Sequence, residues 1–508
     1  MVRYIAFIFA FGLNFVWSQS STEEEKTKKI VLRHANTLEY NEKSGIKAQR
    51  LIGDVEFEHE GALMFCDSAY LYKEKNSLDA FGHVKIINET GETIYGDSLF
   101  YDGNIKKARL RGEVRMEEEK QTLVTNYVDY NLKEDLAYYL GGGTLTNHED
   151  SSVLVSEYGY YFTKKKEFFF KKNVVLTHPD YTIKSDTMMH QTEKDITYYL
   201  GPTTITDSGT YIYCEYGWFD QKSNYSKLEK NATIHTDGQI LSGDSILYDK
   251  KNALGEAFSC VSIEDTAEKV VITGEYGFFN EKDSFTLITQ EALLTQYYKD
   301  DTLYLHGDTL STIQDSSKGR ITLAYHKVKF YKNDFQGMCD SLVMVDKDSL
   351  IFMYSNPVLW TDSNEMKSDT IIIKQAGGTI EKIYFNQNAF IISMLDSSKF
   401  NQIAGKSMEG FFKKNELHKI NVYKDAQTLY YPEDKKDYIG INKATSENLT
   451  IFLKNSDIKT ITFRNPNESS LFPLDNPNNE PLFLANFKWL NTHRPGNSNE
   501  IFSWSKIK

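Results

Sequence analysis

The sequence is short of several features that common classes of protein need. Among 508 residues it has only 9 prolines and 4 cysteines, and Asp plus Glu outnumber Lys plus Arg by 71 to 58. Few prolines suit long strands, because proline cannot donate a hydrogen bond to a β-ladder. The acidic balance argues against the basic face that nucleic-acid binding requires, so we expect no nucleic-acid partner.

Familiar catalytic and cofactor motifs are missing as well. The chain has no G-x-S-x-G, no H-E-x-x-H, no Walker loop, no dinucleotide fingerprint and no Cys/His spacing typical of zinc. Its 11 histidines share no recurring position. We therefore predict that the protein is not an enzyme and that it uses neither a metal nor another cofactor.

Only one long apolar run is present, and it stands at the start of the chain. The run extends from Tyr4 to Trp17, follows Arg3 and is too short to cross a bilayer comfortably. Ser18 offers a small residue for cleavage, so we interpret residues 1–18 as a secretory signal peptide. An uncleaved membrane anchor is the alternative. The sequence thus predicts an exported protein.

One phrase is repeated throughout the chain. The stretches MFCDSAYLY (64–72), IYGDSLFYD (94–102) and LSGDSILYD (241–249) are near copies. Aligned on the acid, the phrase recurs every 29–37 residues from position 67 to position 406. The aligned positions are Asp67, Asp97, Asn126, Glu157, Asp186, Glu215, Asp244, Glu275, Asp308, Asp340, Asp369 and Lys406. A fixed period of this length indicates a repeat architecture.

The positions around the acid are equally regular. An apolar residue lies three before it in nearly every copy, a small residue immediately before it, and an aromatic residue often four after it. The inward parity changes across the acid, which predicts a strand that bends or bulges there. A second phrase, such as GDVEF at 53 and GHVKI at 82, predicts another short strand in each repeat, preceded by its glycine.

The repeated acids raise the question of a metal site or a glycosidase. Their period is about three times that of calcium-binding nonapeptides, and catalysis does not need a dozen similar sites. We expect each carboxylate to accept backbone N–H groups freed at the bend or to face water. Cys66, Cys214 and Cys339 occupy the small-residue position several repeats apart, so we expect buried thiols and no disulfides.

Two stretches carry a resemblance to a known family. RLIGDVEFEHEGALMFCDSAYLY (50–72) and DAFGHVKIINETGETIYGDSLFYD (79–102) resemble the OstA-like branch of the LptA/OstA superfamily. The repeating unit of that family is G-x-V-x-(I/F) followed by (I/M)-x-(G/C)-D-S-x-x-(F/Y)-Y. The similarity is specific over residues 46–132 and continues in weaker form to about 412. The length of the chain resembles the OstA-like proteins of Bacteroidota-type bacteria.

The resemblance implies an all-β fold, namely an elongated β-jelly roll of stacked antiparallel bent strands around an apolar groove, with a small β-rich C-terminal cap. It implies a periplasmic protein that binds lipopolysaccharide by the acyl chains of lipid A and bridges towards the outer-membrane translocon. Other jelly-roll components would join by edge-strand pairing, which could include end-to-end self-association. Association with the outer membrane is left open.

On this resemblance, the apolar positions of the two phrases become candidates for lining the groove, although each could also be an ordinary core residue. The candidates are Met64, Ile94, Leu123, Leu154, Ile183, Ile212, Leu241, Ile272, Val55, Val84 and Val114.

The expected organisation has four parts. Residues 1–18 are the signal peptide, 19–45 a lead-in whose segment 28–40 forms the first edge strand, 46–412 the repeats, and 413–508 a C-terminal cap or docking region. Irregular spacing suggests further boundaries near 280–335 and 373–400, and a short amphipathic helix is predicted near 480–490. Two other functions stay open: a parallel β-helix that binds or processes polysaccharide, and an exported scaffold that binds only protein.

Overall fold

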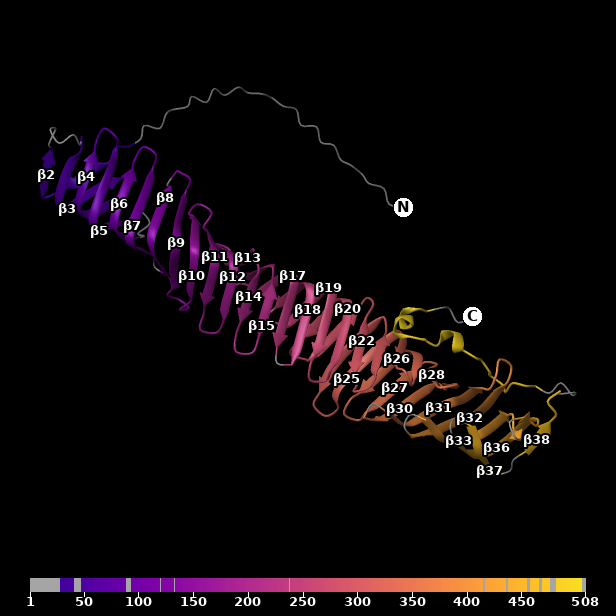
Figure 1. The fold of residues 1–508 in the computed structure, drawn as a ribbon. Coiled ribbons are helices and arrows are strands. Elements are labelled where there is room, and N and C mark those ends of the chain that lie inside the picture. Colours follow the sequence, from indigo (N-terminus) through magenta and orange to yellow (C-terminus); the bar gives the residue numbers. More distant parts are fainter. Residues whose placement is uncertain are drawn as a thin grey trace, which may run out of the picture. The chain divides into compact units, whose positions relative to one another are not determined.

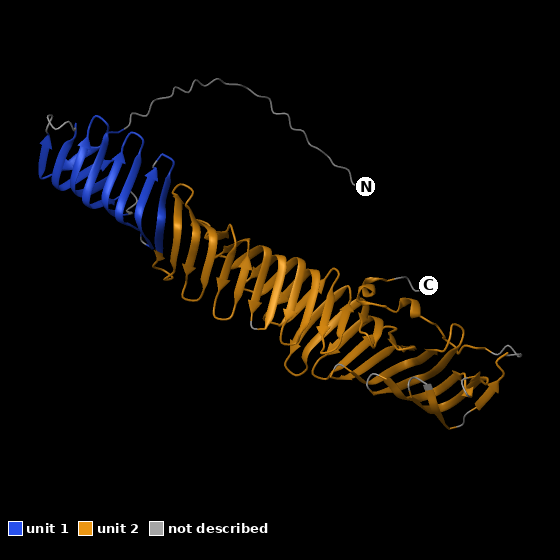
Figure 2. Cartoon of the chain, viewed as in Figure 1, with its two compact units in different colours: residues 1–145 blue, residues 146–508 orange. Residues whose placement is uncertain are grey.

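The computed structural model describes residues 28–40, 47–87, 93–118, 120–131, 133–236, 238–377, 379–413, 416–434, 437–454, 457–465, 468–475 and 481–504. The predicted signal peptide lies outside the described residues. The chain divides into two compact units, residues 1–145 and 146–508 (Figure 2). This division was not among the boundaries that the sequence suggested.

The strands of the first unit are short at its amino end and about eleven residues long thereafter. They are β1 (Val31–His34), β2 (Thr37–Tyr40), β3 (Gln49–His59), β4 (Ala62–Tyr72), β5 (Ser77–Ile87), β6 (Thr93–Asp102), β7 (Lys107–Glu117), β8 (Gln121–Asn131) and β9 (Leu136–Asn147), which reaches the division between the units.

The second unit continues with strands of similar length, some of which are interrupted at their centre. They are β10 (Val153–Phe162), β11 (Glu167–Thr177), β12 (Thr182–Gln191), β13 (Ile196–Tyr199), β14 (Thr203–Thr206), β15 (Tyr211–Cys214), β16 (Tyr216–Asp220), β17 (Tyr225–Thr236), β18 (Gln239–Asp249), β19 (Leu254–Asp265), β20 (Val270–Asn280), β21 (Phe285–Thr289), β22 (Leu293–Tyr297), β23 (Thr302–His306) and β24 (Thr309–Asp315).

The remaining elements are β25 (Gly319–Tyr331), β26 (Gln336–Val345), β27 (Leu350–Tyr354), β28 (Val358–Thr361), β29 (Asn364–Lys367), β30 (Thr370–Ala376), β31 (Thr379–Met394), β32 (Phe400–Lys413), β33 (Glu416–Tyr430), β34 (Glu433–Asp434), β35 (Asp437–Tyr438), β36 (Ile441–Lys454), β37 (Asp457–Arg464), β38 (Glu468–Phe472), and the 3₁₀ helices η2 (Asn491–His493) and η3 (Ser498–Phe502).

Successive strands pair with one another, and every strand pair defined among the described residues is antiparallel. Figure 1 shows the strands of each unit stacked in chain order. The predicted all-β jelly roll is confirmed. The alternative of a parallel β-helix is wrong, because its rungs would pair in parallel.

The segment predicted to form the first edge strand contains two short strands, β1 and β2. β1 and β2 lie one after the other along β3, where Leu32 is opposite Phe57 and Leu38 is opposite Leu51. Between them, the Asn36 N–H donates to the Gly53 carbonyl over 2.9 Å. Asn36 therefore occupies the position that an acid fills in later repeats, one repeat earlier than the sequence pattern revealed.

Each long strand bends near its middle, as the change of parity predicted. In β4 the pairing register shifts between Phe65 and Ser68, which flank the acid. Opposite, β3 contains two left-handed residues, Gly53 with φ 81° and Asp54 with φ 45°. The expectation that the glycine precedes a separate strand is wrong, because β3 continues through it. We call the acid and the left-handed pair together the corner.

Glycine at the corner has a steric cause in the first unit. A Cβ atom on Gly82 would lie 2.3 Å from the Asp67 Oδ2 atom, and one on Gly112 would lie 2.2 Å from Asp97 Oδ2. Both glycines also have φ near 77°, where L-residues are strained. The acid therefore folds over its neighbour's backbone. Later corners use pairs such as Lys230 and Asn231 (φ 58° and 53°) instead.

The corner divides each strand into two arms. An arm that follows a left-handed pair is hydrogen-bonded to arms that precede an acid, and these arms together form wall A. The remaining arms form wall B. In the first unit, side chains of both walls meet in one buried cluster, which includes Phe57 and Met64 of wall A and Leu71 and Leu99 of wall B. The core therefore lies between two facing layers, as in other packed sheets.

The ladder does not stop where the sequence pattern fades. β33 lies beyond residue 413, where the repeats were expected to end, and it pairs with β32 and β36. Glu447 and Asn465 form a further corner, in which Glu447 Oε2 lies 3.1 Å from Asn465 Nδ2. The helix predicted near 480–490 is absent from residues 481–490. Asn486, with φ 67°, interrupts any helix there, and within residues 491–504 only the 3₁₀ helices η2 and η3 follow.

Candidate functional site

In the second unit, one row of aliphatic side chains follows wall A from strand to strand. Each member is the direct partner of the next, so neighbouring Cβ atoms stand about 5 Å apart on one face. We call it the aliphatic row; from β10 to β23 its members are Leu154, Leu176, Ile183, Ile205, Ile212, Ile234, Leu241, Ile263, Ile272, Leu294 and Leu305.

The row is not sealed from solvent along its whole length. Ile212 and Leu241, both predicted from the sequence, are partly exposed, whereas the predicted residues Leu154, Ile183 and Ile272 are each 6 % exposed. The unpredicted members between them, such as Ile234 and Ile263, are partly exposed too. Between β10 and β20, therefore, this inward face is apolar and partly solvent-accessible.

Wall B presents a matching row in which aromatic residues alternate with small or polar ones from Thr197 onward. Successive partners run Tyr161, Phe168, His190, Thr197, Phe219, Ser226, Tyr248, Gly255, Phe279 and Thr286. The alternation has a packing reason: a Cβ on Gly255 would lie 1.8 Å from the Phe279 ring. Phe279 and Tyr248 stack at 6.3 Å between centroids, and both remain partly exposed.

Small residues near the corner let the two walls approach each other. A Cβ on Gly277 of wall B would lie 3.0 Å from Val261 of wall A and 3.0 Å from Ile288. The interior is thus tightly filled beside the corner, and its partly exposed apolar side chains lie towards the free tips of the walls. Such an arrangement can hold an extended apolar molecule by burial, at about 0.8 kcal/mol per methylene group.

The candidate groove residues of the first unit are, except for one, buried from solvent. Met64 and Ile94 belong to an equivalent wall A row that also contains Leu123, which is partly exposed. Val55, Val84 and Val114 lie one position nearer the corner and are at most 1 % exposed. All except Leu123 belong to one hydrophobic cluster.

The chain's own amino-terminal segment covers this cluster. Ile30 is 9 % exposed, and its N–H donates to the Asn76 side chain over 3.0 Å. The Lys28 carbonyl lies 3.0 Å from His59 Nε2, while His59 Nδ1 lies 2.7 Å from the Tyr101 hydroxyl on the other wall. These contacts tie the tips of walls A and B together at β3–β6.

The corner carboxylates contact side chains of the left-handed pair more often than they accept hydrogen bonds from backbone N–H groups. Asp67 lies 2.7 Å from His83 Nδ1, and Glu157 accepts from Asn173 Nδ2 over 2.6 Å. The further pairs are Glu215 with Asn231, Asp308 with Lys327 and Asp369 with Asn388. A backbone donor, as expected from the sequence, occurs at Glu275, which accepts from the Cys260 N–H over 3.3 Å.

These pairs explain the titration of the acids in physical terms. The hydrogen bond from Lys172 holds the pKa of Glu157 below its usual range. Within the described residues, no three His, Cys, Asp or Glu side chains are grouped so as to hold a metal ion. The acids therefore organise the bend.

The cysteines at the small-residue position are buried, as predicted. Burial raises the pKa of Cys66 to about 11 and that of Cys214 to about 12, so both thiols stay protonated near neutral pH. Cys339 is 4 % exposed, and burial raises its pKa further. Cys260 belongs to a left-handed pair and is exposed.

A cavity of about 560 Å³ lies beside the hairpin turns of the first unit, lined by residues that include Phe100, Tyr138, Asp102 and Asp129. Two of its carboxylates have partners in the chain. Asp102 accepts from two backbone N–H groups of its own turn, and Asp129 Oδ2 accepts from Tyr138 over 3.2 Å. The cavity thus lies beside turns whose Asp102 and Asp129 side chains are hydrogen-bonded within the chain.

Sequence reasoning missed a set of buried polar residues on the outer side of wall A. Glu365 is fully buried, and Gln402, Gln336 and Lys329 are at most 4 % exposed. All four bind the C-terminal segment, which is described below. A signal was present: around residues 389–394 the text AFIISM is apolar at odd and even positions, so both faces of that strand must be covered.

A family model described as "OstA-like protein" matches residues 27–186. Over these residues the chain is similar to the OstA-like family. The OstA-like segment holds β1 to β11 and part of β12, and therefore the corners from Asn36 to Asp186. No curated protein matches the chain. Among the described residues, none of the helices has the length and apolar character needed to cross a membrane.

Proposed function

We propose that this OstA-like protein binds lipopolysaccharide in the periplasm and passes it towards the outer-membrane translocon. The acyl chains of lipid A would lie along the aliphatic row of wall A, opposite the aromatic row of wall B. The OstA-like family is associated with lipopolysaccharide transport, and this supports the choice of ligand.

One observation carries the proposal: the row of directly paired aliphatic side chains that stays partly exposed from Ile205 to Ile263. A folded protein rarely leaves such a continuous apolar surface open to water unless something binds there. The row repeats without a break, so it offers the same contact at every strand. That uniformity suits a ligand that moves along the protein.

The net charge of −13 gives no general attraction to an anionic lipid. We infer that binding depends on burial of the acyl chains, while the phosphorylated headgroup stays in water at the free tips of the walls. The proposal includes no catalysis. Its periplasmic location requires export by the predicted signal peptide.

Site-specific photocrosslinking in cells tests the proposal. A photoreactive residue replaces Leu241, which points inward, or Ser242, its neighbour on the outer face of the same arm. We expect an adduct with lipopolysaccharide at position 241 and none at position 242. No adduct at 241 in a folded, exported chain, or equal labelling at both positions, would reject the proposal and leave the protein-binding scaffold as the better reading.

A further inference from the structure

The C-terminal segment 481–504, which we call the strap, lies on the outer face of wall A in the second unit. Leu484 joins a buried cluster with Phe390, Ile392 and Phe400, which all point away from the interior. Leu490 and Trp504 of the strap pack on a second outer cluster formed by Met338, Val358 and Trp360. In Figure 1 the strap is the yellow segment beside β26 to β32.

Buried polar side chains of the wall hold the strap's backbone. Gln402 binds it twice, donating to the Leu482 carbonyl over 3.0 Å and accepting from the Leu484 N–H over 2.8 Å. The fully buried Glu365 accepts from the Leu490 N–H over 2.8 Å. Lys329 donates to the Ser503 carbonyl over 2.7 Å. These groups form a binding site for an extended chain.

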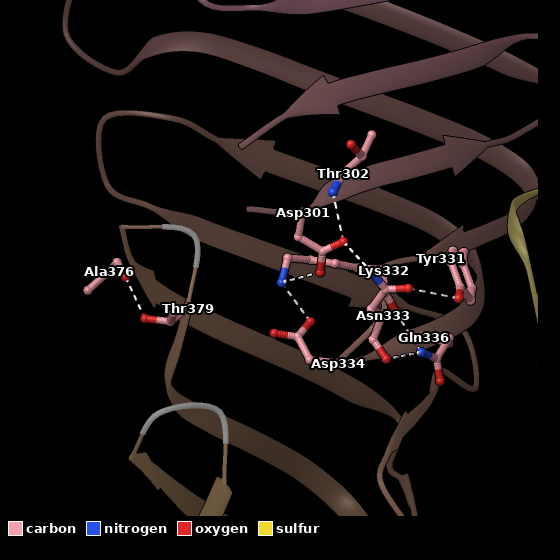
Figure 3. A network of polar contacts seen from close by, with 9 residues as sticks. All are labelled: Asp301, Thr302, Tyr331, Lys332, Asn333, Asp334, Gln336, Ala376 and Thr379. Carbon is pink, nitrogen blue, oxygen red and sulfur yellow. Dashed lines mark hydrogen bonds and ion pairs between the residues drawn. The ribbon is translucent and has the colours of Figure 1, made fainter. Parts of the chain in front are cut away.

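The strap is also tied to the turn between β25 and β26. Arg494 Nε donates to Gln336 Oε1 over 2.8 Å. Figure 3 shows the other side of that turn, where Gln336 also donates to the Lys332 carbonyl and the Lys332 ammonium lies between Asp301 and Asp334. The Lys332 distances are 3.2 Å to Asp301 and 2.6 Å to Asp334. The strap thus connects to a network that reaches the turn before β23.

The aliphatic row is buried throughout the part of wall A that the strap covers. The aliphatic row continues past Leu305 through directly paired residues, all at most 4 % exposed: Phe330, Leu359, Met366, Ile391, Ile403, Thr428 and Ala444, with Gly337 between the first two. Before the strapped region, the row is partly exposed from Ile205 to Ile263, where the outer face carries residues such as Thr233 and Ser242 and no strap, and it is already buried at Ile272, Leu294 and Leu305.

We propose that the strap limits how far along wall A the apolar ligand can bind. By joining outer side chains of wall A from β25 to β36, it keeps the interior behind them dry, so that the partly exposed, acyl-binding part of the row, which ends at Ile263 in β19, does not extend into this region. Detachment of the strap frees wall A to move and opens the interior of β25–β36 to the same ligand. This inference rests on the proposed function.

The test compares two inward positions of one row in the full chain with lipopolysaccharide as the probe. A small diazirine-bearing residue replaces Leu241, outside the strapped region, or Ile403, within it. The strap is loosened by the double substitution Leu490→Ala and Arg494→Ala, or removed by ending the chain at residue 480. Thr492→Ala, at an exposed strap position, is the matched control. Hydrogen exchange of the strap confirms its release.

With the strap intact or with Thr492→Ala, we expect adducts at position 241 only. With the strap loosened or removed, position 403 gains adducts while position 241 keeps them. Labelling at 403 with the strap in place, or none at 403 once hydrogen exchange shows the strap released, would overturn the inference and leave the proposed function standing. Absence of labelling at 241 in every variant would reject the proposed function itself. If the shortened chain fails to fold, the double substitution decides the question.

Discussion

At the scale of single residues, the sequence reveals where each corner lies but not which groups the corner acid contacts. The small residue and the acid could be recognised because inward positions alternate by two along a strand, and a change of parity needs a bulge. What the acid binds could not be recognised. His83 lies sixteen positions after Asp67, and only the strand register brings them together. The resulting hydrogen bond raises the pKa of His83 above its usual value.

The steric explanation of the corner glycines predicts the effect of Gly112→Ala. The added methyl group combines a positive φ with the contact to Asp97, so we expect a loss of about 1–3 kcal/mol. Gly141→Ala is the matched control, because Gly141 has φ 96° and nothing within 4 Å of its Cβ position. Thermal unfolding and hydrogen exchange of β6 and β7 measure both. Equal losses in the two variants would show that backbone strain alone matters.

At the scale of elements, the strands were predictable and the strap was not. The apolar residues of EPLFLANFKWL (480–490) are spaced much as in an amphipathic helix, yet segment 481–490 adopts no helix. Contacts with the wall prevail over that local preference, because each buried strap side chain contributes about 1.5–3 kcal/mol. Those contacts depend on which outer faces of β26 to β36 are apolar, and the repeat pattern of the first strands gives no hint of it.

The carboxyl-terminal end of the strap contacts a titratable side chain, His306. The His306 ring lies 4.4 Å from the Phe502 ring between centroids, and its Nδ1 atom lies 2.8 Å from the Ala292 carbonyl. Burial lowers the pKa of His306, although Asp308 and Glu291 act in the opposite direction. A lowered histidine pKa means that the stabilisation belongs to the neutral ring and is lost as the pH falls below about 6.5.

Acidification should therefore loosen the carboxyl-terminal end of the strap. Between pH 7.5 and pH 5, hydrogen exchange of residues 498–504 should become faster after correction for the intrinsic effect of pH. In His306→Gln, which has no titrating ring, this added acceleration should be absent. An unchanged acceleration in that variant would assign the effect to another group, and no acceleration in the natural chain would contradict the prediction.

At the scale of the whole molecule, the period of the sequence is what made the fold predictable. A strand that contacts only its neighbours can be recognised from a single repeat. The same property hides the difference in solvent exposure along the second unit. Leu241 and Ile403 occupy the same row with similar side chains, but one is partly exposed and the other is 4 % exposed. That difference depends on how closely the walls approach and on the strap.

The repeat organisation predicts that one period can be removed from the full chain without loss of folding. Deletion of residues 215–243 joins Cys214 to Asp244 and recreates the phrase YIYCDSILYD, with a small residue before the acid. Ile212 would then pair with Ile263 in place of Ile234, and the aliphatic row would stay continuous. Because each repeat contacts only its neighbours, the cost should be limited to the lost repeat.

We expect the shortened chain to keep its β circular dichroism and to unfold within several degrees of the natural chain. Deletion of residues 215–229 is the contrasting variant, because it joins Cys214 to the left-handed pair at Lys230 and Asn231. That junction would place two wall A arms in succession and leave their partners in wall B unpaired, so this variant should aggregate or lose its cooperative transition. If both deletions fold equally well, the two-armed repeat is not the unit of folding. If neither folds, stability depends on contacts that extend beyond neighbouring repeats.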